Sequence, residues 1–186
     1  MIQAKEMTGE QWARFRSALH AAHLPADDIE LPGRTFFEFT QEGETVGRGG
    51  SEAHGTEGLL RSLVVEPNHR SKGVGVAVLQ FIEAAAAAQG IARLHLLTTT
   101  AAGFFEQQGY DLHPRGSEPV PIAQTSSSEG FARARRVTCA KRSLQKNHLI
   151  FLLKQRKEGL AFHVADPVSR VTRGLPCLQQ RRLHTR

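Results

Sequence analysis

Hydrophobic and polar residues follow two spacings along this chain, and these spacings predict a succession of strands and helices. Short apolar or alternating segments bounded by turn residues are typical of strands. These segments are Ile2–Lys5, Thr35–Thr40, Thr45–Glu52, Leu59–Val65, Leu94–Thr98, Tyr110–His113 and Arg136–Leu144. Apolar residues at helical spacing predict three helices, one after Thr8, one over Val74–Gln89 and one over Ala101–Gln108. This order of elements predicts an α/β (α+β) domain.

The first helix has a recognisable start. Thr8 is expected to cap it, because Gln11 stands three residues later at the capping-box position. A short acidic turn or helix is expected further on, over Ala26–Leu31.

The junction between the Leu59–Val65 strand and the helix that begins at Val74 carries the most informative pattern. Pro67 stops the strand, and the residues Arg-Ser-Lys-Gly-Val-Gly follow at positions 70–75. The first turn of a helix exposes about four unpaired backbone N–H groups and carries roughly half a positive charge. Gly73 and Gly75 let an anion approach that backbone closely.

Charge around this junction also suits an anion. No acidic residue occurs in the helix before Glu83, and Arg70 and Lys72 place cationic side chains beside the loop. Two common phosphate motifs do not fit: the spacing G-x-x-x-x-G-K-[ST] is absent, and Val78 stands where a dinucleotide fingerprint needs its third glycine or an alanine.

The remaining pattern, R-x-x-G-x-G after a V-x-P strand end, resembles the pyrophosphate loop of the GCN5-related N-acetyltransferases (the GNAT family). A second match lies within Thr98–Tyr110, which contains A-x-x-F-[YF]-E-x-x-G-[FY]. The order of elements over residues 1–144 is similar to the topology of that family. The resemblance implies a central, mixed and mostly antiparallel sheet that is splayed at its middle and flanked by helices.

A narrower resemblance adds two further segments, Gly58–Val65 and the Leu-Pro-x-Asp-Asp stretch Leu24–Asp28. With them the chain is similar to the second type of arsenic-resistance N-acetyltransferases. The acceptor that this implies is a small amine, including amino-acid-like arsenicals or their phosphinic analogues.

The resemblance implies that acetyl-coenzyme A is the cosubstrate and that the acceptor amine attacks it directly. The pantetheine arm would pair with the strand edge at Leu63 and Val65, the acetyl carbonyl would lie near Leu63–Val64, and the pyrophosphate would bind the N–H groups from Arg70 to Gly75. The residues assigned to the cofactor in this way are Leu63, Val64, Val65, Arg70, Ser71, Lys72, Gly73, Val74, Gly75, Thr98 and Phe105.

Three positions bear on the acid that would protonate the leaving thiolate. Many relatives have a tyrosine where this chain has Phe105, and Phe105 has no proton to give. Tyr110, the only tyrosine, is expected to pack in the core. Thr98 stands where some relatives have an asparagine.

The residue that would take the proton from the amine is open. Glu52, His54 and Glu57 lie on or just after one strand and are candidates, with solvated loop positions as the alternative. Arg61 and Ser62 interrupt an apolar strand, so Arg61 either holds an anionic group of the substrate or forms a structural ion pair. We assign Glu52, Arg61 and Ser62 as candidate catalytic residues.

Charge divides the chain into two parts. From Arg133 onward there are 14 Lys and Arg residues and two acidic residues, which leaves ten basic and 16 acidic residues before it. The front therefore carries about −6 and the rest about +12, which indicates a folded domain at 1–144 and a basic extension at 145–186. The extension either binds nucleic acid or a partner, packs on the domain or a second subunit, or has no role. We expect poor order there, and another flexible loop over Pro114–Gly130.

Composition limits the environment. The two cysteines, Cys139 and Cys177, suit a reducing compartment rather than a disulfide scaffold. No signal peptide or membrane span is expected, which predicts a soluble cytoplasmic protein. The nine histidines show no metal-ligand spacing, so no metal is expected.

Two classes of function follow. The first is an acetyl-coenzyme A-dependent N-acetyltransferase acting on a small amine, with a homodimer left open and nucleic acid not expected as a partner. The second is a non-catalytic module, in which the fold only binds or the basic tail contacts nucleic acid.

Overall fold

The structure is a computed structural model of the 186-residue chain, and it describes residues 1–114, 116–125 and 137–142. Its elements follow one another as β1 (Ile2–Glu6), α1 (Gln11–Ala21), β2 (Arg34–Gln41), β3 (Glu44–His54), β4 (Glu57–Val65), the 3₁₀ turn η1 (Pro67–His69), α2 (Val74–Ala88), β5 (Arg93–Thr98), α3 (Ala102–Gln107), β6 (Asp111–His113), α4 (Val120–Ala123) and β7 (Val137–Arg142). The strands and helices expected from the sequence within these residues are all present, with shifts of a few residues at their ends.

The strands form one seven-stranded sheet in the order β1-β2-β3-β4-β5-β7-β6. Its neighbours are antiparallel except β4 and β5, which run parallel. The predicted α/β fold with a mixed, mostly antiparallel sheet flanked by helices is therefore confirmed.

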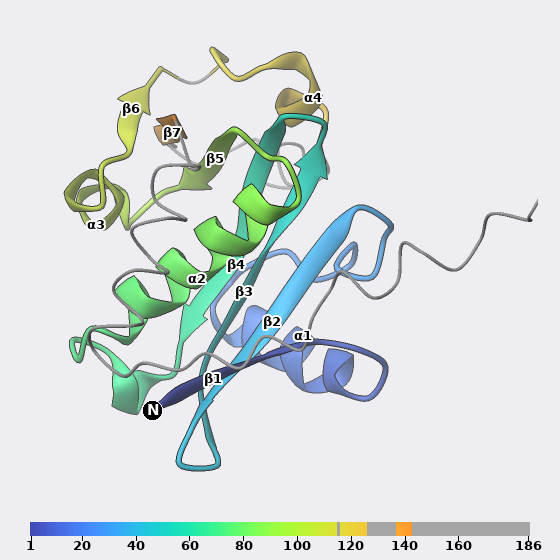
Figure 1. Ribbon diagram of the computed structural model, residues 1–186, viewed down its shortest axis with the longest axis vertical. Coiled ribbons are helices and arrows are strands. Elements are labelled where there is room, and N and C mark those ends of the chain that lie inside the picture. The colour runs from blue at the N-terminus through green and yellow to red at the C-terminus, as the bar shows by residue number, and fades with distance from the viewer. Residues whose placement is uncertain (115, 126–136, 143–186) are drawn as a thin grey trace, which may run out of the picture.

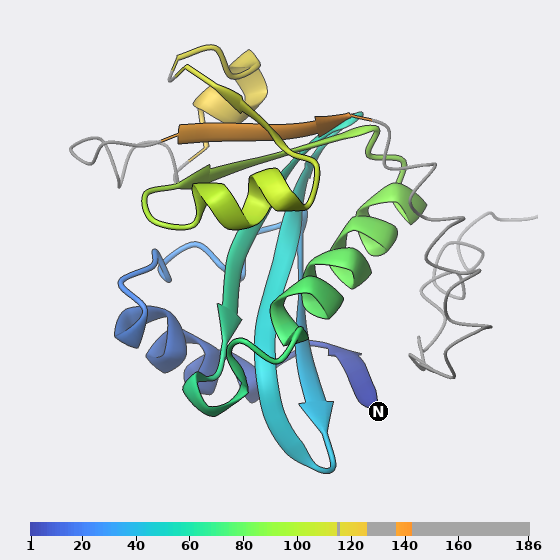
Figure 2. The same ribbon diagram turned by 90° about the vertical axis from the view of Figure 1, so that its left-hand side faces the viewer.

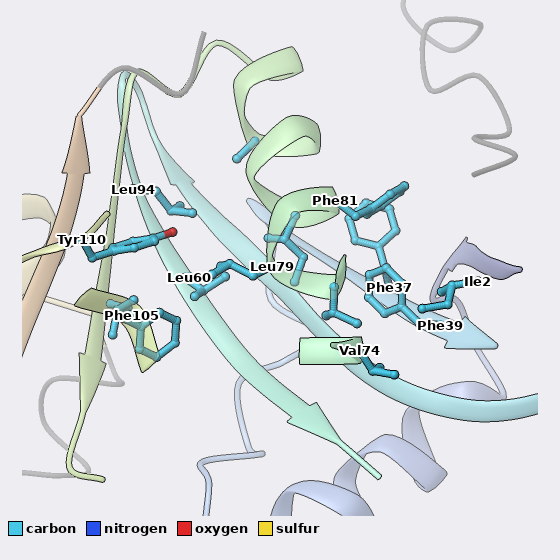
Figure 3. Close-up of a cluster of buried hydrophobic side chains, with 14 of the residues drawn as sticks. Ile2, Phe37, Phe39, Leu60, Val74, Leu79, Phe81, Leu94, Phe105 and Tyr110 are labelled. Atoms are coloured by element: carbon cyan, nitrogen blue, oxygen red, sulfur yellow. The ribbon is translucent and has the colours of Figure 1, made fainter. Parts of the chain in front are cut away.

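Helices cover both faces of the sheet (Figures 1 and 2). α2 lies on one face, where it buries the larger apolar cluster, which includes Phe37, Phe39, Leu60, Ile82 and Leu94. Figure 3 shows Phe37, Phe39 and Leu60 of the strands near Leu79 and Phe81 of α2. α1 lies on the opposite face and contributes Phe15 and Leu19 to a second cluster.

The sheet is splayed between β4 and β5. The two strands pair only over Glu57–Leu59, which face Arg93–His95. β5 then continues along β7, while β4 continues along β3, and Figure 2 shows the two strands diverging. Among the residues that the structure describes, no strand therefore lies beside the edge of β4 from Leu60 to Val65 on the β5 side.

A β-bulge on β4 accompanies the splay. Opposite the step from Arg48 to Gly50 on β3, β4 steps from Val64 to Arg61, so β4 contains an extra residue. Ser62 adopts a left-handed backbone with φ of +56°, which is uncommon for a residue other than glycine. The bulge turns the strand at the point where the sheet opens.

Two local predictions need correction. The N-cap of α1 is Glu10 rather than Thr8, and only half of the predicted capping box forms: the Thr8 N–H donates to the Gln11 side chain at 2.9 Å. The expected loop Pro114–Gly130 contains helix α4, whose Ile122 is fully buried. The apolar pair of Val120 and Ile122 was too short a signal to predict a helix there.

Other predictions lie outside the described residues. They concern the extension at 145–186, the end of the last strand beyond Arg142, and parts of the 114–130 loop.

Candidate active site

A cavity of about 600 Å³ lies at the splay between β4 and β5. Its walls are Leu59–Val65 of β4, Leu96–Ala101 at the end of β5, Phe104 and Phe105 of α3, and Ala22–Pro25 after α1, with Arg70 also lining it. This volume lies in the range of pockets that hold small ligands or cofactors. The divergence of the strands thus creates a space beside an unpaired strand edge.

The N-terminus of α2 adjoins this space. Gly73 is its N-cap, with φ of +78°. Gly75 lies in its first turn, where an added Cβ would lie 3.6 Å from the Val65 side chain and 3.7 Å from the Phe104 ring. No side chain caps the helix and its first turn holds no acidic residue. The predicted helix start at Val74 is confirmed.

The loop leading into α2 presents free backbone donors. Within the described part of the chain, the N–H groups of residues 71–75 donate no hydrogen bond, while the N–H groups of Val76 and Ala77 donate to the Gly73 carbonyl. Ser71 adopts φ of +59°, so left-handed residues at 71 and 73 alternate with other conformations. Such alternation can turn consecutive N–H groups toward one anion.

Arg70 departs from its predicted role. Its N–H donates to the Pro67 carbonyl at 3.3 Å, inside the 3₁₀ turn, and its side-chain Nε donates to the Val65 carbonyl at 3.1 Å. The Arg70 N–H therefore already donates a hydrogen bond, and the Arg70 side chain binds the last carbonyl of β4. The donors left for an anion begin at Ser71.

Arg61 is buried, only 4% exposed, and its guanidinium contacts two carboxylates. It contacts Asp28 through both terminal nitrogens, at 2.7 and 2.9 Å, and Glu52 at 2.9 Å. Arg34 contacts the same two carboxylates, and His54 contacts Glu52 at 3.1 Å. We call Asp28, Arg34, Glu52, His54 and Arg61 the arginine–carboxylate network. Of the two roles that the sequence left open for Arg61, the structure shows the structural ion pair.

Glu52 is held as a carboxylate in this network. Burial alone would raise its pKa, but the hydrogen bonds and charges of Arg34 and Arg61 outweigh burial and lower the pKa below the ordinary value of 4.5. A carboxylate with a lowered pKa is a weak proton acceptor. Glu52 also does not line the cavity.

The other two base candidates from the sequence also lie in pairs away from the cavity lining. His54 contacts Glu52, as above, and Glu57 contacts Arg93 at 2.8 Å and His95 at 2.5 Å across the start of β4 and β5. Sequence position on or after β3 placed these residues near the centre of the sheet but could not show which face they occupy.

Phe105 and Tyr110 pack against each other, with ring centroids 5.5 Å apart. Phe105 is 6% exposed and lines the cavity, whereas Tyr110 does not line it. The Tyr110 hydroxyl donates to Glu83 of α2 at 3.0 Å, and Lys141 of β7 contacts the same carboxylate. Tyr110 is thus a core residue as predicted, and the only tyrosine hydroxyl of the chain lies outside the cavity lining.

Hydroxyl groups do line the cavity. Ser62, Thr98, Thr99 and Thr100 are among its residues. The Thr98 hydroxyl accepts a hydrogen bond from the Ala101 N–H at 3.0 Å and so fixes the start of α3, while its own proton stays available to a ligand.

Of the residues predicted for the cofactor, six line the cavity: Leu63, Val64, Val65, Arg70, Thr98 and Phe105. The others, Ser71, Lys72, Gly73, Val74 and Gly75, form the loop and helix start that adjoin it. Of the predicted catalytic residues, Arg61 and Ser62 line the cavity and Glu52 does not. Sequence reasoning missed His23, which lies in the segment after α1 and lines the cavity.

Neither a metal-ligand cluster nor a membrane-spanning helix is found among the described residues. No group of three or more His, Cys, Asp or Glu side chains is placed there to hold a metal ion. No helix in that part of the chain is both long and apolar enough to cross a membrane.

Comparisons with curated proteins find amino-acid acetyltransferases. That of Ectopseudomonas mendocina is 41% identical over 69 residues, which are 37% of this chain and 16% of that protein. That of Pseudomonas fluorescens is 39% identical over the same lengths. The chain thus covers about a sixth of the length of these relatives.

Comparisons with solved structures show the same fold. The N-acetylglutamate synthase of Neisseria gonorrhoeae, complexed with coenzyme A and N-acetyl-glutamate, matches 77% of this chain and 35% of its own with a TM-score of 0.66 and 16% identity. A putative acyl-CoA N-acyltransferase of Klebsiella pneumoniae matches 77% of this chain and 98% of its own with a TM-score of 0.60 and 21% identity. Neither comparison points to an arsenic-resistance subtype.

A family model described as "Acetyltransferase (GNAT) domain" matches residues 32–112, which run from the turn before β2 to β6 and include the splay, the cavity strands and the α2 loop. Acetyl-coenzyme A is the cosubstrate of this family, and coenzyme A is present in several of the matching structures. Residues 32–112, a little under half of the chain, therefore match the GNAT acetyltransferase domain.

Proposed function

We propose that this protein is an acetyl-coenzyme A-dependent N-acetyltransferase whose acceptor is the amine of an amino acid. The observation that carries the proposal is the combination at the splay: an unpaired edge of β4, a cavity beside it, and unused backbone donors at the start of α2. A long cofactor could use all three features: its diphosphate would bind the backbone donors, its amide-bearing arm would pair with the strand edge, and its reactive end would lie in the cavity.

The cofactor would be held mostly by backbone groups. Its pyrophosphate binds the N–H groups from Ser71 to Gly75, with Lys72 at the rim. The pantetheine arm adds to the open edge of β4 at Leu63 and Val65, as an extra strand would. The thioester then reaches Leu63 and Val64 beside the bulge, and Thr98 and Phe105 border it from the other wall.

The reaction needs no covalent enzyme intermediate. The neutral amine attacks the thioester carbonyl, the C–N bond forms, the C–S bond breaks and coenzyme A leaves as a thiol. Backbone N–H groups beside the bulge stabilise the negative charge on the carbonyl oxygen. Because no tyrosine lines the cavity, the thiolate takes its proton from the attacking nitrogen or from a hydroxyl of the lining.

The acceptor class comes from the relatives and agrees with the cavity. The curated relatives are named amino-acid acetyltransferases. Among the described residues, no carboxylate side chain lines the cavity, so this lining offers no anion to attract a polycationic acceptor, while Arg70 favours an acceptor that brings its own carboxylate. Amino-acid-like arsenicals and phosphinic analogues share that carboxylate and amine, so they belong in the same test.

A thiol-release screen tests this function. The purified protein is mixed with acetyl-coenzyme A and, one at a time, with the standard amino acids, their arsenic and phosphinic analogues, and a polyamine as the control of opposite charge. We expect saturable thiol release and an N-acetylated product with at least one amino acid or analogue, and none with the polyamine. Release with the polyamine alone, or with no amine at all, would overturn the proposed acceptor class.

A further inference from the structure

His23 is a histidine of the cavity lining that the proposed function has not yet used. It follows α1, lines the cavity together with Leu24 and Pro25, and is exposed to solvent. Its backbone has φ of +54°, a left-handed conformation that is uncommon for histidine, and it is fixed by the hydrogen bond from its N–H to the His20 carbonyl at 3.0 Å. The imidazole has no hydrogen-bond partner among the described residues.

The other titratable groups at the cavity cannot take this role. Within the part of the chain that the structure describes, Arg61 and Arg70 are the only other titratable side chains that line it, and arginine stays protonated at any ordinary pH. Glu52, His54 and Glu57 do not line the cavity and are engaged in ion pairs. Among the described residues that line the cavity, His23 is therefore the one side chain left that can accept a proton from an amine.

We propose that His23 is a catalytic residue that accepts the proton of the acceptor amine, directly or through one water; this rests on the proposed function. An amino acid reaches the cavity as an ammonium, and only the neutral amine has a lone pair for attack. The His23 imidazole takes one proton from the ammonium. After the amine attacks the thioester, the second proton passes from nitrogen to the departing thiolate, and the His23 imidazolium returns its proton to solvent.

The chain offers a matched pair of variants for the test. His23→Asn removes the proton acceptor and keeps a residue that tolerates the left-handed backbone. His20→Asn is the control, because His20 lies one turn earlier at the end of α1, is exposed and does not line the cavity. Thermal unfolding and calorimetry with acetyl-coenzyme A show that each variant is folded and binds the cofactor.

The readout is the rate of thiol release across about pH 6 to 9, with the amino acid that reacts fastest in the screen. General base catalysis is worth about 100-fold or more, so we expect kcat/KM of His23→Asn to fall by about that factor near neutral pH. Added imidazole should restore part of the rate that His23→Asn loses. His20→Asn should match the wild type in each measurement.

Two other outcomes are separable. If the wild-type protein transfers acetyl groups but His23→Asn keeps its rate and pH profile, the role of His23 is wrong and the proposed function stands. If the wild-type protein releases no thiol with any acceptor, the proposed function is wrong and the role of His23 is wrong with it.

Discussion

At the scale of single residues, the most informative group is the arginine–carboxylate network under β4. Two arginines and two carboxylates lie almost entirely out of water on the face that α1 covers. A buried charge is tolerated only when it is paired and hydrogen-bonded. Here each carboxylate contacts both arginines, so removing one member leaves the rest poorly compensated.

Arg61→Met tests this dependence. Removing the guanidinium leaves Asp28 and Glu52 buried with only Arg34 between them, and we expect a loss of about 3 kcal/mol in the free energy of unfolding. Arg14→Met is the matched control, because Arg14 lies exposed on α1, and it should change stability by less than about 0.5 kcal/mol. Denaturant unfolding of the two variants measures both. An Arg61→Met protein as stable as the control would show that the network contributes nothing.

The lowered pKa of Glu52 predicts how the stability of the protein changes with pH. Its pKa in the folded protein lies below the ordinary value of 4.5, so the unfolded chain binds its proton more readily than the folded one. The stability that it contributes is therefore complete above about pH 4.5 and is lost as the pH falls through the lower folded value. Unfolding measured from neutral to acid pH should show a smaller decline in Glu52→Gln than in the wild type. An equal decline in both would contradict the assignment.

At the scale of elements, the opening between β4 and β5 depends on how closely β3 approaches its neighbours beside the bulge. Gly50 pairs with Phe36 and Arg61, and a Cβ placed on it would lie 2.1 Å from the Thr35 carbonyl and 2.8 Å from the Phe36 Cα. These are backbone atoms of the adjoining strand, so they cannot move without shifting β2. Glycine at this position lets β2, β3 and β4 stay in register next to the bulge.

Gly50→Ala should therefore destabilise the sheet, by about 2–3 kcal/mol, which is typical of overpacking in a core. Gly103→Ala is the control, because a Cβ there meets nothing within 4 Å and Gly103 lies inside helix α3, where alanine is favoured. Thermal unfolding should show a lowered midpoint for the first variant and an unchanged or raised midpoint for the second. The reverse order would mean that the close contact at Gly50 is absent.

The sequence predicted most elements because their signals are local. The helix start at Val74 could be read from Pro67, two glycines and the apolar spacing that follows, and the strands from their bounding turns. The bulge at Ser62 could not be predicted, since nothing in a Leu-Arg-Ser-Leu stretch marks a left-handed residue. The face that Glu52, His54 and Glu57 occupy, and the exposure of His23 to the cavity, depend on how distant strands and loops pack.

At the scale of the whole molecule, the stretch 32–112 that matches the GNAT domain contains the residues that we propose for the cofactor, while His23 comes from the segment before it. The domain limits of 1–144 and 145–186 stay a prediction, as do a homodimer and the role of the basic extension. The turns in the sequence were enough to predict the order of the strands along the chain. The cavity could not be predicted in the same way, because the segment Ala22–Pro25 lines it together with β4.

The central claim is that the N–H groups of residues 71–75 bind the diphosphate of acetyl-coenzyme A, and a calorimetric titration tests it most directly. Gly73 and Gly90 stand at opposite ends of α2, both with left-handed backbones and with no atom within 4 Å of an added Cβ. A side chain strains the backbone at both positions, aspartate less than most residues, and at position 73 aspartate places a negative charge where the phosphate would bind.

We predict that Gly73→Asp lowers the unfolding temperature no more than Gly90→Asp does but weakens acetyl-coenzyme A binding at least about tenfold, a loss of about 1.4 kcal/mol. Gly90→Asp should lose a little stability at the C-terminal end of the helix and bind the cofactor like the wild type. Equal binding by Gly73→Asp and Gly90→Asp, or no heat of binding with the wild-type protein, would contradict the account.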